Sequence, residues 1–280
     1  MLLLSLLFAV ALKQFWEPSN PLHRDGWIAN LELKLRVWLP KVGIDQPVAV
    51  FGTALVLLVA SIALVDHFLH NEAKWLQLIF ATAILLYSFG RGEFNQYVTQ
   101  FIVAEAKRDW SKALETARKI GCDTHDIAEN DWQALNKRFL SKASYLGFER
   151  FFAVIFWFVI FGPAGAFAYR LSHLWQQRSP HAAIAHWLWV IEWPAVRVLG
   201  LSYCITGNFG SCINRWKNSL LSNTMTSEAL VFDNMLGALS VDDSIAQTPE
   251  VTRRELEAIQ QLQSRTLWCW LGIIGILFIA

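Results

Sequence analysis

The feature that most constrains the fold is a series of apolar runs of about the length needed to cross a lipid bilayer. A clear example is FERFFAVIFWFVIFGPAGAFAYRL, residues 148–171, which carries no charge from Phe151 to Tyr169. A helix needs roughly 20 mostly apolar residues to cross the hydrocarbon core. Hydrophobic residues make up 54% of the chain and charged residues only 17%, which departs from the balance of soluble domains. The sequence therefore predicts an all-α integral membrane protein.

The same pattern recurs along the chain and predicts several crossings. The apolar candidates are Leu2 to Trp16, Val48 to Val65, Leu76 to Phe89, Phe151 to Tyr169, Trp187 to Thr206 and Leu267 to Ala280. The first, third and last of these are short, so we expect them to be tilted, partly re-entrant or in thin bilayer. The prediction is a polytopic protein whose spans are joined by amphipathic cytoplasmic helices.

Positive charges indicate which loops face the cytoplasm, because cytoplasmic loops retain Lys and Arg during insertion. In a model with six spans, one side of the membrane receives Lys13, Arg24, Lys34, Arg36 and Lys41, the ten cations from Arg91 to Arg150, and Arg215, Lys217, Arg253, Arg254 and Arg265. The other side receives only Lys74, Arg170 and Arg178. We therefore expect a multi-pass membrane protein with both long polar loops in the cytoplasm.

Hydrophobic periodicity divides the chain into five segments. Residues 1–90 form an N-terminal membrane part with up to three spans and an interfacial helix, and 91–150 form a cytoplasmic helical loop. The fourth and fifth spans occupy 151–207, a cytoplasmic helical segment occupies 208–266, and 267–280 form a C-terminal span. Within the first loop, Asp109 is expected to cap a helix and Gly121 to end it.

Charge and cysteine content exclude several functional classes. The net charge of +1 gives no basic field of the kind that binds nucleic acid. The four cysteines form no Cys-x-x-Cys pair and no zinc-like spacing with histidine, so we interpret them as free thiols. Neither a metal site nor a catalytic motif is predicted, and the lipid bilayer is the expected surrounding.

Two features inside the membrane segments are candidate sites. Gly162, Pro163 and Gly165 fall within the fourth span, where they predict a kink that either lines a cavity or packs against neighbouring helices. The fifth span carries Glu192 and Arg197 on either side of Pro194. Ionisable residues in a membrane are costly unless they are paired or face water. Glu192 and Arg197 are therefore either a ligand site, which a bend at Pro194 would assemble, or a headgroup contact and a packing contact.

Three stretches of the sequence resemble a known family. EPSNPLHRDGWIANLELKL near the start, RDWSKALETARKIGCDT in the first loop, and the opening stretch with its Phe-Trp and Gly-Pro-Ala-Gly resemble the AmpE family of membrane proteins associated with regulation of inducible β-lactamase. More distantly, they resemble the CobD/CbiB cobinamide-phosphate synthases. In the first loop the matching residues include Asp123 and Thr124. Cys122 stands where the synthases have arginine, and Glu149 is the one carboxylate just before Phe-Trp.

The resemblance implies a regulatory or sensing protein linked to β-lactamase induction and cell-wall recycling. On this reading it is no enzyme, needs no cofactor and binds a cell-wall-derived or other small molecule in a membrane-level cavity. The residues expected to contact the ligand are Asp123, Thr124, Glu149, Glu192 and Arg197, with Gly162, Pro163, Gly165 and Pro194 shaping the cavity. The alternative is an ATP-dependent amide-bond synthase that uses Mg²⁺. The missing arginine counts against it, because a guanidinium is the natural partner of a phosphate.

Overall fold

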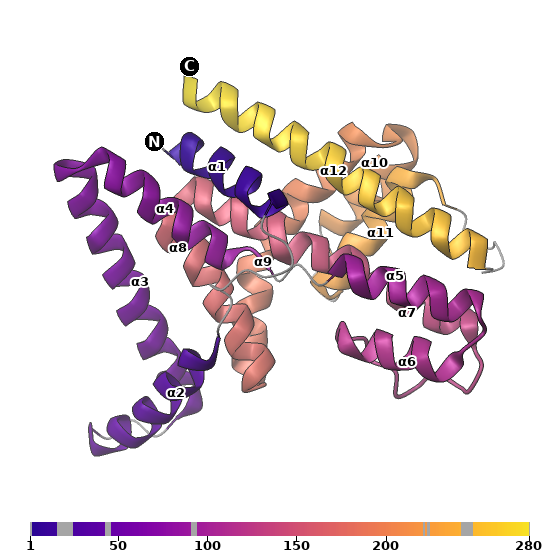
Figure 1. Cartoon of the computed structure of the whole chain (residues 1–280), viewed down its shortest axis with the longest axis horizontal. Coiled ribbons are helices and arrows are strands. Elements are labelled where there is room, and N and C mark those ends of the chain that lie inside the picture. Colours follow the sequence, from indigo (N-terminus) through magenta and orange to yellow (C-terminus); the bar gives the residue numbers. More distant parts are fainter. Residues whose placement is uncertain are drawn as a thin grey trace. The chain divides into compact units, whose positions relative to one another are not determined.

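The protein is all-helical throughout the residues that the structure describes. The computed structural model describes 2–15, 25–42, 46–90, 94–220, 222, 225–241 and 249–279, and it contains no strand in those ranges (Figure 1). The first six α-helices and a 3₁₀ turn are α1 (Leu2–Phe15), α2 (Gly26–Trp38), η1 (Leu39–Val42), α3 (Pro47–Glu72), α4 (Lys74–Ser88), α5 (Phe94–Ala106) and α6 (Trp110–Lys119). They are followed by α7 (Trp132–Gly147), the π-helix η2 (Phe148–Phe152), α8 (Ala153–Arg178), α9 (Ala182–Thr206), α10 (Phe209–Leu220), α11 (Ser227–Leu239) and α12 (Pro249–Ile279).

The chain forms two compact units that are not consecutive in sequence. The first unit comprises Met1–Arg91, Arg150–Trp193 and Leu277–Ala280, and the second comprises Gly92–Glu149 and Pro194–Ile276. The first half of α9 thus belongs to one unit and its second half to the other. The five segments expected from periodicity describe how the chain alternates between membrane and cytoplasm, and this remains a prediction. Each of the two compact units combines parts of several of these segments.

Three helical stretches are long and apolar enough to cross a membrane. They are Pro47–Glu72, the combined run Trp132–Arg178 and Ala182–Thr206. The apolar helices Leu2–Lys13 and Lys74–Ser88 are shorter, as the sequence predicted for the first and third candidates. The last candidate is the apolar end of α12, a single helix of 31 residues that begins at Pro249.

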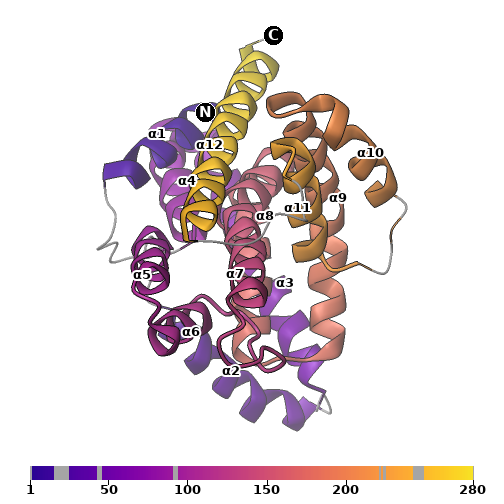
Figure 2. The same ribbon diagram turned by 90° about the vertical axis from the view of Figure 1, so that its right-hand side faces the viewer.

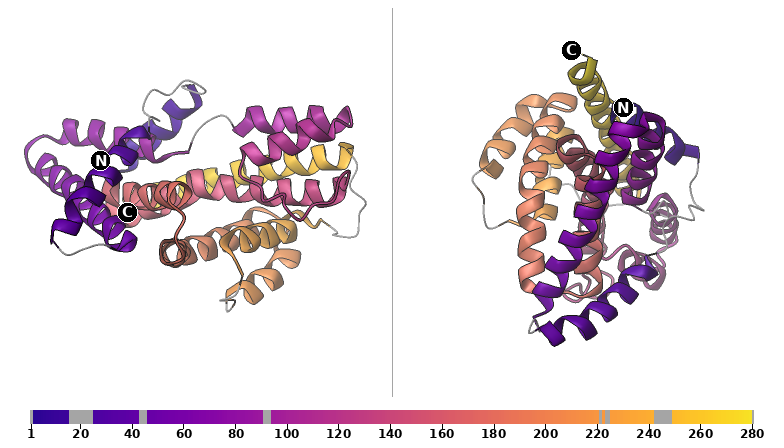
Figure 3. Two further views of the ribbon diagram at one scale, coloured as in Figure 1. Left: turned by 90° about the horizontal axis from the view of Figure 1, so that it is seen from below. Right: turned by 90° about the vertical axis from the view of Figure 1, so that its left-hand side faces the viewer.

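Aromatic packing holds the first unit together around α3 and the second half of α8. Figure 3 (right) shows α2 crossing one end of α3. The ring of Phe167 on α8 stacks against Trp27 at 6.2 Å and against Tyr87 at 5.9 Å. The ring of Trp175 lies 5.7 Å from Phe51 on α3. Each such pair adds about 0.5–1.5 kcal/mol beyond its apolar burial, so the packing fixes how α8 lies along α3 and α4.

The cation of α1 lies against two aromatic rings in the same unit. The ammonium of Lys13 donates a hydrogen bond to the carbonyl oxygen of Gly90. It also lies 4.8 Å from the ring centre of Phe151 and 5.6 Å from that of Phe89. A cation over an aromatic face is stabilised by the quadrupole of the ring. These contacts fix the end of α1 against the end of α4 and the start of α8.

The fourth apolar run is not a single straight helix. Its backbone leaves helical geometry at Phe161 (φ −122°, ψ 15°) and at Gly162 (φ 65°, ψ −153°), directly before Pro163. The Gly162 conformation is one that essentially only glycine adopts, and proline supplies no N–H to the helix preceding it. The run Phe151 to Tyr169 is thus divided between two helical pieces.

Close packing at Gly165 accompanies this break. A Cβ atom at Gly165 would lie 2.3 Å from the carbonyl oxygen of Trp157 and 2.8 Å from Cβ of Phe161. Only a residue without a side chain fits there. By contrast, α9 continues without interruption through Pro194.

The second unit contains the amphipathic helices predicted for the loops. Asp109 caps α6 by accepting a hydrogen bond from the backbone N–H of Lys112 at 3.1 Å, and Gly121 ends that helix with a φ of 85°, as predicted. Helices α5 and α7 lie side by side (Figure 2), with the rings of Phe101 and Phe139 stacked at 3.7 Å. All four cysteines are free thiols, also as predicted.

A buried polar network joins three helices of this unit. The side-chain amide of Asn136 on α7 donates to Glu105 Oε1 on α5 at 2.6 Å and to Thr252 Oγ1 on α12 at 2.9 Å. The hydroxyl of Thr252 donates to the same Glu105 oxygen at 3.1 Å. All three side chains are buried. Because an unsatisfied buried polar group is costly, the network constrains how these helices pack.

Candidate functional site

The loop between α6 and α7 carries two of the predicted ligand residues, and its shape follows from its sequence. The positive φ of Gly121 lets the chain leave α6, and the backbone N–H of Cys122 returns to the carbonyl oxygen of Ala117 at 3.0 Å. This is the usual way in which a glycine ends a helix. Asp123 and Thr124 follow directly, so the turn sets their position.

The side chains of Asp123 and Thr124 have different environments. Thr124 is buried, and its hydroxyl oxygen accepts a hydrogen bond from Nε of Arg118 at 3.0 Å. Asp123 is exposed, and its carboxylate accepts from the backbone N–H of His125 at 3.2 Å. Thr124 therefore orients an arginine of α6, while Asp123 forms a local turn.

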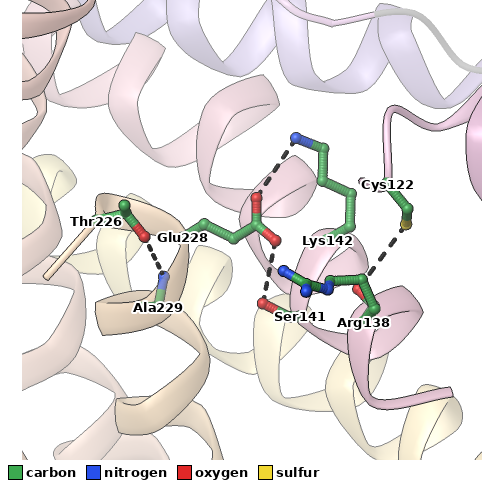
Figure 4. Close-up of polar contacts among 7 residues, drawn as sticks. All are labelled: Cys122, Arg138, Ser141, Lys142, Thr226, Glu228 and Ala229. Atoms are coloured by element: carbon green, nitrogen blue, oxygen red, sulfur yellow. Dashed lines mark hydrogen bonds and ion pairs between the residues drawn. The ribbon is translucent and has the colours of Figure 1, made fainter. Parts of the chain in front are cut away.

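Three elements meet at Lys142 on α7 (Figure 4). Its Nζ atom lies 3.5 Å from Glu228 Oε2 in the first turn of α11, and Ser141 Oγ donates to Glu228 Oε1 at 3.1 Å. The ammonium also lies 5.1 Å from the ring centre of Tyr145. A Cβ on Gly121 would lie 3.5 Å from Cε of Lys142, so the lysine stem packs on the loop. Lys142 of α7 thus contacts the loop, its own helix and α11.

The electrostatics of this region favour an anion. We define the α7 cluster as Arg118, Thr124, Arg138, Ser141, Lys142 and Glu228. It holds three cations against one carboxylate and adds two hydroxyl donors. Arg118 and Arg138 are exposed, and Lys142 is half-buried, so their donors reach solvent. Arginine and lysine in such an arrangement bind carboxylate and phosphate groups.

Cys122 holds the loop against α7, and its thiol is unreactive. Its thiol is buried and donates to the carbonyl oxygen of Arg138 at 3.8 Å (Figure 4). Burial raises the pKa of the Cys122 thiol to about 12, although the nearby ammonium of Lys142 acts in the opposite direction. Only the thiolate is a nucleophile. The Cys122 side chain therefore provides packing and neither charge nor reactivity.

We expect Cys122 to resist alkylation in the folded protein. At pH 7.5 its labelling by N-ethylmaleimide should be at least roughly a hundredfold slower than in denaturant, because burial limits access and lowers the thiolate fraction. Peptide mass spectrometry of protein in detergent measures this rate, and the Cys122→Ser variant identifies the peptide. Equal rates in the folded and denatured protein would contradict the buried position.

The other predicted ligand residues do not join the α7 cluster through any contact described above. Glu192 is buried in the first unit, where the hydroxyl of Tyr169 donates to its Oε1 at 2.9 Å. Arg197 is buried in the second unit, where Nη2 donates to the carbonyl oxygens of Ser219 at 3.2 Å and Ser222 at 2.9 Å. Glu149, also buried, is the last residue of a segment of the second unit.

These contacts bear on the two interpretations of the fifth span. The guanidinium of Arg197 satisfies carbonyl groups at and just beyond the end of α10, which is a common role for a cation at a helix C-terminus. The hydroxyl of Tyr169 satisfies Glu192 from α8. The Arg197 contacts are of the kind that its interpretation as a packing residue describes, whereas the headgroup contact predicted for Glu192 stays a prediction. Residues from both sides of Pro194 belong to different units, and we describe no common site for them.

Ser141, Lys142 and Glu228 were missed by sequence reasoning. Arg138, Ser141, Lys142 and Tyr145 follow helical spacing on α7, and this pattern was the available signal. Nothing in the sequence indicates that α11, more than 80 residues later, supplies the carboxylate. The contact between α7 and α11 is a product of tertiary packing.

The fold and the cluster define a class, an all-helical membrane protein with helices long enough to span a bilayer and a polar, cation-bearing helical region. Comparison with family models makes the assignment specific. The model described as "Regulatory signalling modulator protein AmpE" matches residues 1–251, and the chain belongs to this family. Searches of curated proteins and of solved structures found no significant match. Family membership indicates a regulatory role.

Proposed function

We propose that the protein is a multi-pass inner-membrane regulator that modulates β-lactamase induction by responding to a cell-wall-derived ligand. The observation that supports the proposal most is the family match over residues 1–251. Three helices of membrane-spanning length agree with the location. The skewed Lys and Arg distribution supports a cytoplasmic position for the loop before α7.

The α7 cluster is the ligand contact that the geometry favours. Peptide fragments of the cell wall carry carboxylates, and Arg118, Arg138 and Lys142 offer donors of matching charge. Thr124 and Ser141 add hydroxyls from the loop and the helix. Glu228 holds Lys142 and Ser141 in the absence of ligand. A ligand carboxylate would exchange for Glu228, and the first turn of α11 would then respond to binding.

Charge-neutral variants of the cluster test the function. In a strain that lacks its own copy of the protein and carries an inducible β-lactamase, the Arg138→Gln/Lys142→Gln variant should shift the induction response to a β-lactam by at least about tenfold, as expected for a lost interaction of 1.4 kcal/mol or more. The matched control is Lys112→Gln/Lys137→Gln, which removes two exposed cations from α6 and α7. An unchanged response with normal membrane levels of the cluster variant would contradict the proposal.

The amide-bond synthase alternative predicts a different outcome. Purified protein incubated with ATP, Mg²⁺ and candidate acids and amines would then form a product. The buried Cys122 thiol in place of a guanidinium supplies no charge for a phosphate. Product formation by the wild type would overturn the regulatory proposal.

A further inference from the structure

The break in α8 lines a cavity, as one interpretation of the Gly162–Pro163 pair predicted, and none of the residues that line it belongs to the α7 cluster. Its volume is about 710 Å³, which lies within the range of small-molecule sites. One wall is polar and consists of Asp66 and His70 from α3 and Lys74 and Gln77 from α4; the other consists of Leu2, Ile160, Phe161, Gly162 and Phe278. All these residues belong to the first unit. Irregular backbone at membrane depth is tolerated where it is buried or lines a cavity.

The polar wall is ordered by hydrogen bonds between its own members. Gln77 is buried, its amide nitrogen donates to Asp66 Oδ1 at 3.2 Å, and its amide oxygen lies 3.3 Å from His70 Nδ1. Gln77 therefore fixes a carboxylate and an imidazole on one side of the cavity.

The two charges of this wall are not paired with each other. Among the described residues Asp66 has Gln77 as its hydrogen-bonding partner, and no ion pair joins Asp66 to Lys74. The wall thus presents a carboxylate and an ammonium separately. A ligand with one cationic and one anionic group would complement the half-buried carboxylate of Asp66 and the exposed ammonium of Lys74.

The surroundings of the cavity indicate that such a ligand also has an apolar part. Phe161 is 63% exposed and Ile160 is 50% exposed at the break. Nearby on α3 and α4, Phe68 and Trp75 are also largely exposed. Exposed apolar side chains on helices of membrane length face lipid. A molecule entering from the lipid would place its head group on the polar wall and its chains along these side chains.

We propose that this cavity binds a phospholipid whose head group combines a primary ammonium with a phosphate. The ammonium donates to Asp66, and the phosphate accepts from Lys74 and lies near His70. The acyl chains contact Phe161, Ile160 and Phe278. A primary ammonium has N–H donors for the carboxylate, whereas a quaternary ammonium has none. The site therefore distinguishes phosphatidylethanolamine from phosphatidylcholine, and its carboxylate disfavours anionic phosphatidylglycerol.

Native mass spectrometry of the full chain, released from nanodiscs of defined composition, tests the proposal. Wild-type protein in equimolar phosphatidylethanolamine, phosphatidylcholine and phosphatidylglycerol should retain the first lipid at least about tenfold over the others, which corresponds to 1.4 kcal/mol. Asp66→Asn should reduce this preference by about tenfold, whereas Lys74→Gln should reduce the retention of all three lipids by about tenfold, because each of them carries a phosphate. Glu72→Gln, which changes an exposed charge between them in sequence, is the matched control and should leave both the preference and the retention unchanged.

A second variant and a soluble competitor distinguish the possible outcomes of this experiment. Lys74 is exposed and makes no contact that folding requires, so the Lys74→Gln variant gives a result even if Asp66→Asn fails to fold. Soluble O-phosphoethanolamine should not displace the lipid at equal concentration, because it lacks the acyl chains. Equal retention of the three lipids, a total retention unaffected by Lys74→Gln, or displacement by the soluble head group would each overturn the proposal.

Discussion

The Gly165→Ala variant is expected to lower the thermal unfolding midpoint of the purified protein by roughly 5 to 10 °C. The added methyl would lie 2.3 Å from the carbonyl oxygen of Trp157 and 2.8 Å from Cβ of Phe161. Neither is the flexible end of a side chain, so relief requires the two pieces of α8 to separate. Overpacking of this kind costs about 1–3 kcal/mol and sometimes more. Scanning fluorimetry in detergent measures the shift.

Two other glycines give the controls for this experiment. Gly272 is helical and has open space around its Cβ position, so Gly272→Ala should raise the midpoint by about 2–4 °C, because alanine is favoured over glycine in a helix by about 1 kcal/mol. At Gly162 the nearest side-chain atom to an added Cβ is 4.0 Å away. Gly162→Ala therefore tests backbone strain alone and should lower the free energy of unfolding by about 1–3 kcal/mol. A Gly165→Ala midpoint equal to that of Gly272→Ala would show that α8 is not bent as described.

The Asn136→Ala variant is the second substitution with a large expected effect. It removes the amide that donates to Glu105 at 2.6 Å and leaves a buried carboxylate with fewer donors. Loss of one partner of such a buried charge costs about 3 kcal/mol or more. The free energy of unfolding in denaturant, followed by tryptophan fluorescence, measures it. The double variant Asn136→Ala/Glu105→Gln should recover part of the loss, because a neutral amide tolerates burial better than a carboxylate does.

The same network predicts a pH dependence. Burial raises the pKa of Glu105, and the hydrogen bonds from Asn136 and Thr252 oppose that shift. The folded state therefore holds a proton at pH values where the unfolded chain has released it. Stability then falls as the pH rises from the ordinary glutamate value through the folded value. The Glu105→Gln variant should lose this dependence while other titrations remain, and an identical pH profile for both proteins would contradict the raised pKa.

Sequence patterns predicted the parts of the fold that depend on local chemistry. The Asp109 cap and the end of α6 at Gly121 both follow from residues within a few positions of one another. The break in α8 was anticipated at the correct glycine-proline pair for the same reason. The polar network of Glu105, Asn136 and Thr252 was not, because its members come from helices far apart in sequence.

The candidate site was predictable only in part, for a related reason. Asp123 and Thr124 were found through a family resemblance, and their hydrogen-bond partners, Arg118 and His125, are close to them in sequence. The contact of Lys142 with Glu228 depends instead on how α11 packs on α7. Glu192 and Arg197 were identified because charges are rare in apolar runs. This criterion identifies residues that are energetically costly in a membrane, but it does not identify their function. Their contacts with Tyr169 and with the carbonyl groups near the end of α10 required the tertiary structure. The Gly162–Pro163 pair indicated that a cavity could lie beside the kink, but nothing in the sequence indicated that Asp66 and Lys74 from α3 and α4 would form its polar wall.

The unbroken length of α12 makes it a fixed spacer. At 1.5 Å per residue, its 31 residues extend about 46 Å, whereas the hydrocarbon core of a bilayer is about 30 Å thick. Thr252, at the polar end, lies about 20 Å along this axis from Leu267, where the apolar end begins. If that apolar end is immersed in lipid, the helix sets the height at which the α5 and α7 pair stands above the headgroups. Thinning of the bilayer would then be transmitted along α12 to Thr252 and to its hydrogen bond with the buried carboxylate of Glu105.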